Sequence, residues 1–208
     1  MTGLIRKPWG HEYCAYRNEH VAIWVLHITK GERTSLHAHP NKNTALIILR
    51  GTVELEFIRG RHRVMTGLDK INIFRGRFHR TRAVTDAVLL EVEAPGDKGD
   101  IVRLDDDYGR AALPLETGTE PIDEHCLRIS ESGCHHDFAA CGLMVSRPSN
   151  GFDLPLNFGT TLIITLRGGL RGGLLPPGDA VDAISFIRMA SKFSPIPGSQ
   201  FLQIWKSE

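Results

Sequence analysis

The feature that most constrains this chain is a pair of histidines one residue apart, His37 and His39, followed on a later segment by His79. The sequence between them contains short runs typical of β-strands, with turns between the runs: 44–50, 52–58, 61–65 and 70–74. Side chains alternate between the two faces of a strand, so His37 and His39 can present both imidazoles to one point. His79 can supply a third imidazole from another strand. This spacing predicts a metal site inside a small β-barrel.

Three neutral imidazoles suit several divalent metals and leave coordination positions open for water or a substrate. We therefore expect a divalent metal ion as cofactor, with zinc as the first choice and iron, manganese or nickel as alternatives. Isolated histidines elsewhere, such as His20, His27 and His62, are interpreted as ordinary core or surface residues.

Composition excludes some classes of partner. Lys plus Arg (25) nearly balance Asp plus Glu (24), so no global field draws the protein to nucleic acid or to an acidic membrane. The chain shows no apolar segment typical of a signal peptide or a membrane span, which predicts a cytoplasmic protein with free cysteines. The cluster of Cys and His between 125 and 141 lacks a Cys-x-x-Cys knuckle and is interpreted as an ordinary loop.

The pattern along the chain predicts a metal-binding barrel over 1–110, a connector over 111–124, and a second unit over 125–208. The first half is rich in strand-like runs, including 21–29 and 84–93, whereas 111–124 has little periodicity and contains Pro114, Gly118 and Pro121. Within 178–193, apolar residues recur at helical spacing, which predicts one helix in the second half.

The second half repeats part of the first. The run from Thr44 to Gly51 aligns without a gap on the run from Thr161 to Gly168, and the same alignment places His37 and His39 on leucines 154 and 156. Such a repeat is typical of duplication. We therefore expect a second barrel that has lost its metal ligands.

Two longer patterns resemble the signature motifs of the cupin superfamily. They consist of Gly31, His37-Ala38-His39, Thr44 and Gly51, and then of Gly67, Phe74, Gly76 and His79. The resemblance implies an all-β fold, the double-stranded β-helix or jelly-roll barrel, here a bicupin with a degenerate second barrel and one helix. In that superfamily a Glu ligand stands at the position of Thr44. We therefore count Thr44 as the fourth metal position, with a neutral hydroxyl in place of the carboxylate.

Other stretches within 6–110 resemble the cupin module of type II phosphomannose isomerases, which is often joined to a mannose-1-phosphate guanylyltransferase. They include Lys7-Pro8-Trp9-Gly10 and the run from Asp100 through Tyr108 to Arg110. The resemblance implies a metal-dependent aldose–ketose interconversion of a sugar phosphate, with the metal on the three histidines. It also implies that Arg80 is the arginine of the family's His-Arg pair and acts near the substrate.

The chemistry leaves several points open. A divalent ion would act as a Lewis acid on sugar oxygens while a base moves a proton between adjacent carbons. Candidate bases are Glu12, Glu91, Glu93 and His27, and the arginines around His79 suit a small anionic substrate such as a sugar phosphate. A three-histidine non-haem iron dioxygenase and a non-catalytic sugar or effector binder are the alternative functions. Cupins commonly pair through sheet edges, which suggests a homodimer.

Overall fold

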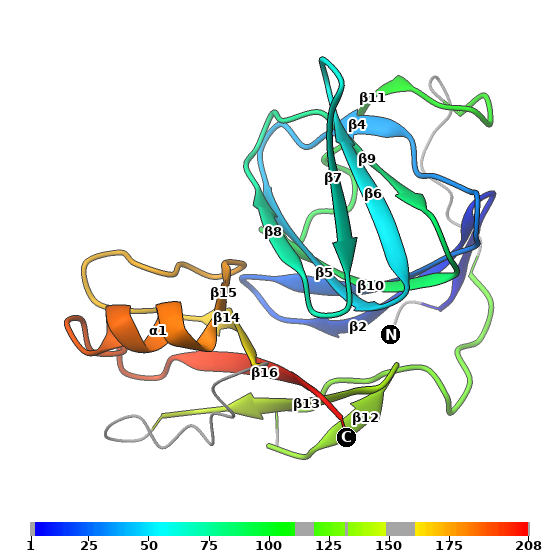
Figure 1. Cartoon of the computed structure of the whole chain (residues 1–208). Helices are drawn as coiled ribbons and strands as arrows, with labels where there is room; N and C mark the ends of the chain where they lie inside the picture. The colour runs from blue at the N-terminus through cyan, green and yellow to red at the C-terminus, as the bar shows by residue number, and fades with distance from the viewer. Residues whose placement is uncertain (1–2, 111–118, 132, 149–160, 208) are drawn as a thin grey trace.

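The computed structural model describes residues 3–110, 119–131, 133–148 and 161–207. These residues form strands almost throughout, with one α-helix among them. Figure 1 shows a barrel of two sheets, built from the N-terminal half, resting on a third sheet built from the C-terminal half. In the described ranges no helix has both the length and the apolar character that crossing a membrane requires.

The barrel consists of two antiparallel sheets. One has the order β1-β2-β3-β10-β5-β8 and the other the order β11-β4-β9-β6-β7. The strands are β1 Ile5–Lys7, β2 Gly10–Arg17, β3 Ala22–Ile28, β4 Leu36–Ala38, β5 Asn43–Arg50, β6 Thr52–Phe57, β7 Arg61–Thr66, β8 Lys70–Ile73, β9 His79–Ala83, β10 Ala87–Ala94 and β11 Val102–Asp105. Successive segments of the chain pass between the two sheets, which gives a double-stranded β-helix. The all-β cupin-type fold predicted from the sequence motifs is confirmed for this half.

Strict alternation fills the barrel interior. In β6, Val53, Leu55 and Phe57 are buried, whereas Glu54 and Glu56 lie between them on the outer face. The tight turn between β5 and β6 is made by Gly51, whose φ of 87° lies in the left-handed region that favours glycine. A Cβ at this position would also lie 2.3 Å from the carbonyl oxygen of Asp86. The positive φ and the close carbonyl oxygen therefore each require glycine at this position.

The C-terminal half forms one antiparallel sheet with the order β12-β13-β16-β14-β15. Its strands are β12 His136–Phe138, β13 Cys141–Ser146, β14 Leu162–Arg167, β15 Ala180–Asp182 and β16 Gln200–Lys206. This order matches β2-β3-β10-β5-β8 of the barrel, strand for strand, with β14 in the place of β5. The aligned run that ends at Gly168 thus occupies the same place as the run that ends at Gly51. Residues 154 and 156 lie outside the described residues, and the two-barrel interpretation stays a prediction.

The predicted helix is shorter than its periodic pattern. Helix α1 spans Ala183–Ala190, and Asp182 caps it by accepting a hydrogen bond from the Ser185 N–H at 2.8 Å. Residues 180–182, at the start of the pattern, instead form the edge strand β15. The helix buries Phe186 against Phe201 of β16, at a ring distance of 5.1 Å, so it covers the face of the third sheet that points away from the barrel.

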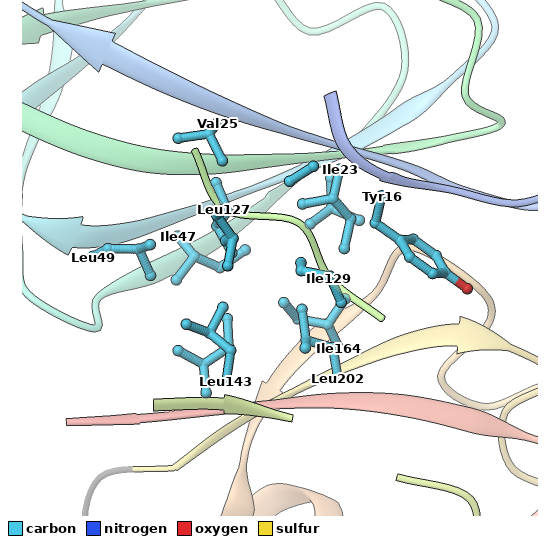
Figure 2. Close-up of a cluster of buried hydrophobic side chains, with 14 of the residues drawn as sticks. Tyr16, Ile23, Val25, Ile47, Leu49, Leu127, Ile129, Leu143, Ile164 and Leu202 are labelled. Atoms are coloured by element: carbon cyan, nitrogen blue, oxygen red, sulfur yellow. The ribbon is translucent and has the colours of Figure 1, made fainter. Parts of the chain in front are cut away.

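A continuous apolar core joins the barrel to the third sheet. Figure 2 shows Ile47 and Leu49 from the barrel facing Leu143 and Leu202 from the third sheet, with Leu127 and Ile129 between the layers. The outward-facing positions of β3, β5 and β10 are therefore as apolar as the inward-facing ones. This explains why these strands read as unbroken hydrophobic runs.

This shared core predicts a large stability effect at Ile47, which is fully buried. We expect Ile47→Ala to lower the free energy of unfolding by about 2–5 kcal/mol, through lost burial and the cavity left behind. Urea denaturation measures this. As a control, Ile58→Ala shortens the side chain of a residue that is 49% exposed. It should lower the free energy of unfolding by less than about 0.5 kcal/mol. Equal losses in the two variants would contradict the proposed packing.

Candidate metal centre

Four buried side chains converge at one end of the barrel interior. His37 lies on β4, His39 directly follows it, His79 begins β9, and Glu91 lies on β10. One potential ligand atom from each lies within 4.8 Å of those of the others. His37 and His79 are register partners between β4 and β9, which fixes two of the rings side by side. The structure thus brings together the three histidines selected from the sequence.

Hydrogen bonds set the tautomer of all three rings. The Nδ1 atoms of His37, His39 and His79 lie 2.8, 2.7 and 3.0 Å from the carbonyl oxygens of Ser35, Asp100 and Arg77, respectively. A carbonyl oxygen only accepts, so each Nδ1 carries the proton and each Nε2 presents a lone pair. The Nε2 atoms of His39 and His79 are buried and have no protein hydrogen-bond partner. Such an arrangement is typical of histidines that bind a metal.

The protonation states also suit a cation. Burial lowers the pKa of His37 well below its usual value, lowers that of His39 to about 4, and lowers that of His79. Burial favours the neutral form of Glu91, but the positive charge of Lys98 and other nearby cationic groups outweighs this effect and lowers its pKa. At neutral pH the group therefore offers three neutral imidazoles and one carboxylate, a donor set that fits zinc or another divalent transition metal.

Thr44, the fourth metal position expected from the sequence, does not line the cavity into which these four side chains point. It is buried on β5, between Glu93 of β10 and Ile73 of β8, and its hydroxyl has no hydrogen-bond partner. The carboxylate of the group comes instead from Glu91, on the neighbouring strand β10. Sequence reasoning named Glu91 only as a candidate base. A signal was present, because Glu91 alternates with the apolar residues Leu90 and Val92 in a strand that is buried on both faces.

Arg80 is not brought together with the histidines. It follows His79 on β9, so its side chain points to the opposite face of the sheet. There its guanidinium group lies 2.5 Å from Asp105 and 3.7 Å from Glu56. Arg77, another of the arginines around His79, stacks on Phe57, with its guanidinium carbon 4.1 Å from the ring centroid.

A cavity of about 60 Å³ opens beside the four side chains. One buried water needs roughly 10–15 Å³ on the same measure, so the cavity has room for an ion and a few small groups. Besides the histidines, its lining is mostly charged. The basic residues are Lys7, Lys42, Lys98, Arg103 and Arg110, and the acidic residues are Glu12, Glu91 and Glu93. An excess of positive charge, increased further by a bound dication, favours a small anionic ligand.

The four candidate bases differ in their position relative to the cavity. Glu12 and Glu93 line it without belonging to the ligand group. Glu93 accepts hydrogen bonds from Lys42 and from the Trp24 indole N–H, at 2.6 and 3.0 Å. His27 lies on the outer face of β3, stacked on His11 at a ring distance of 4.3 Å. His27 is therefore remote from any chemistry in the cavity.

Asp100 holds the backbone that follows His39 and also orients the His39 ring. Its carboxylate accepts hydrogen bonds from the N–H groups of Asn41 and Lys42, at 2.9 and 3.0 Å, and its carbonyl orients the His39 ring. We expect Asp100→Ala to weaken metal binding by about 10–100-fold, as changes behind a ligand commonly do. Competition with a coloured chelator measures this. Asp69→Ala, which removes a similar cap from the Thr66 N–H, should leave the affinity unchanged. Equal affinities in wild type and Asp100→Ala would contradict this role.

No second group with metal-ligand spacing occurs in the described parts of the chain. In the cysteine and histidine cluster, Cys141 is buried in the shared core, whereas His135 stacks on Trp205 and pairs with Asp137. The described part of this segment is not a loop throughout, because His136–Phe138 forms β12 and Cys141 begins β13.

Comparison with known proteins gives similarities to solved structures only. No protein-family model and no curated protein matches the chain. KdgF from Halomonas sp. is 15% identical, with a TM-score of 0.42, over 44% of this chain and 84% of that one. An RmlC-like cupin from Shewanella frigidimarina is 17% identical, with a TM-score of 0.43, over 47% and 86% of the two chains. A putative sugar phosphate isomerase from Acidithiobacillus ferrooxidans is 20% identical, with a TM-score of 0.34, over 36% and 50%.

These similarities concern fold in less than half of this chain. The class of the protein follows from its own strand order and buried donor set. It is a protein with a cupin-type barrel and a candidate three-histidine, one-glutamate metal centre.

Proposed function

We propose that this protein is a metal-dependent isomerase or epimerase that acts on a small sugar phosphate, in the manner of a mannose-6-phosphate isomerase. The observation that carries the proposal is the convergence of three oriented histidines and one carboxylate on a small, charged cavity. An adjacent hydroxyl and carbonyl on a sugar would suit such a site. The resemblance to the phosphomannose isomerase module supports this choice of substrate class.

Different residues around the cavity would bind the metal, bind the substrate and transfer the proton. His37, His39, His79 and Glu91 would hold the ion, which when bound supplies a Lewis acid for sugar oxygens. Arg103 and Arg110 line the cavity and are suited to binding the anionic part of a substrate. A proton must move between adjacent carbons, and Glu12 and Glu93 are the lining carboxylates outside the ligand group. Because these groups are in place before the reaction, they would stabilise the negative charge that develops on the substrate oxygens.

The charged lining weighs against the two other functions considered. A dioxygenase for an apolar substrate would need apolar walls, whereas most side chains that line this cavity are charged or polar. A binder would need no candidate base, whereas two carboxylates face the cavity beside the ligand group. A homodimeric state and a cytoplasmic location remain expectations from the sequence.

Elemental analysis followed by a sugar-phosphate panel tests the proposal. We expect one divalent ion per chain and turnover of mannose 6-phosphate or fructose 6-phosphate that a chelator abolishes and added metal restores. Stoichiometric iron with oxygen uptake would indicate the dioxygenase instead. Tight sugar binding without turnover would indicate the binder, and either result would contradict the isomerase.

A further inference from the structure

Lys98 brings an ammonium group to the metal cavity from the loop between β10 and β11. Its Nζ lies 3.1 Å from Oε1 of Glu12 and 3.7 Å from Oε2 of Glu91. The same atom lies 4.1 Å from the centroid of the Trp24 ring, which its positive charge favours. Lys98 therefore lines the cavity beside one of the four candidate ligands.

The loop that carries Lys98 is held at several points. The Lys42 ammonium donates to the carbonyl of Asp97 at 2.7 Å, and the Gly99 N–H donates to the Asp97 carboxylate at 2.9 Å. The side chain of Asp100 is bound to the backbone of Asn41 and Lys42. These contacts fix the backbone on both sides of Lys98, so the position of its ammonium is a built feature of the cavity.

This position has an electrostatic cost. A cation that shares the Glu91 carboxylate with a divalent ion repels that ion and competes with it for the same oxygens. Glu12 does not need Lys98 for charge balance, because the Lys7 ammonium lies 3.4 Å from the same carboxylate oxygen. Lys98 therefore places a positive charge beside the candidate ligands in addition to the one that already balances Glu12.

We propose that Lys98 is a catalytic residue, which donates a hydrogen bond to the substrate oxygen on which negative charge develops during proton transfer. The ammonium would act on the substrate from its place beside Glu91, next to the candidate ligands. This inference rests on the proposed function. It adds to that function a second electrophilic group, with the chemistry to bind an oxyanion.

The test compares Lys98→Met with Lys98→Arg. Methionine preserves the packing of the stem on Trp24 without the charge, whereas arginine preserves the charge. We expect Lys98→Met to bind zinc about tenfold more tightly in a chelator competition. In the metal-loaded protein, the same variant should lose about 10²–10³-fold in kcat. Lys98→Arg should retain wild-type zinc affinity and part of the kcat, and Lys30→Met, at an exposed lysine, should change neither.

The two readouts move in opposite directions only if Lys98 acts as proposed. Weaker or unchanged zinc binding in Lys98→Met would assign it a structural role and overturn the proposal, as would an unchanged kcat. If the wild-type protein turns over no member of the panel, the proposed function fails. The zinc affinity of Lys98→Met then still decides whether the ammonium opposes the ion, since that measurement needs no substrate.

Discussion

Replacing His39 with alanine is expected to abolish stoichiometric metal binding. The His39 ring supplies a buried Nε2 with no protein partner, and the other ring nitrogen is fixed by the Asp100 carbonyl. Removing a ligand should cost more than the roughly 10–100-fold that changes behind a ligand cost. Elemental analysis of the purified variant, together with chelator competition, measures the loss. The remaining two imidazoles and Glu91 could not complete the site, because no other histidine in the described ranges lines the cavity.

The matched control is His62→Ala. His62 lies on the outer face of β7 and pairs with Glu54 at 3.1 Å, away from the cavity. We expect its metal content and affinity to equal those of the wild type. Full metal content in His39→Ala would remove the candidate centre, and with it the isomerase proposal. A reduced content in both variants would indicate a general loss of folding, which circular dichroism would detect.

Strand positions in the barrel were predictable because local chemistry determines them. The runs expected at 44–50, 52–58, 61–65 and 70–74 correspond to β5, β6, β7 and β8 within one residue or so at each end. Hydrophobic alternation and glycine turns carry this information within a few residues. The two histidines of the His-x-His pair likewise had to share a face, because side chains on a strand repeat every second residue.

The fourth candidate ligand was harder to predict because it depends on which strands become neighbours. Glu91 reaches the histidines only because β10 lies between β3 and β5, a pairing between segments far apart in the chain. No local pattern contains that register. The orientation of Arg80, in contrast, followed from the alternation rule, since a neighbour of an inward-facing His79 must face outward. The resemblance to the phosphomannose isomerase module identified Arg80 as a candidate but gave no information on where its side chain points.

The second half shows the same division between local and non-local information. Its aligned run forms β14, as the sequence repeat implies, and the third sheet reproduces the strand order of five barrel strands. The partner sheet of the barrel has no counterpart among the described residues of this half. Helix α1 occupies the position along the chain that β9 occupies in the barrel, between the last two strands. The described part of the second half is therefore suited to supporting the barrel from outside.

Replacing the oxygen ligand is expected to have the second large effect on metal binding. Glu91 and Thr44 lie on adjacent strands, and each is buried, but only Glu91 lines the cavity and supplies a carboxylate oxygen to the 4.8 Å group. We expect Glu91→Gln to weaken zinc binding by more than about 100-fold, because a neutral amide replaces the one anionic donor. Thr44→Val keeps the shape of the side chain and removes only a hydroxyl that has no hydrogen-bond partner, so its zinc affinity should stay close to that of the wild type.

Chelator competition on the two variants, with unfolding by urea as a check on stability, separates these residues. Thr44→Val can even be slightly stabilising, because its buried hydroxyl has no hydrogen-bond partner to lose. A large loss of zinc affinity in Thr44→Val with little change in Glu91→Gln would assign the fourth metal position to Thr44 on β5. The ion would then keep its full double charge among neutral donors, and Glu91, paired with Lys98, would become available as the base for proton transfer.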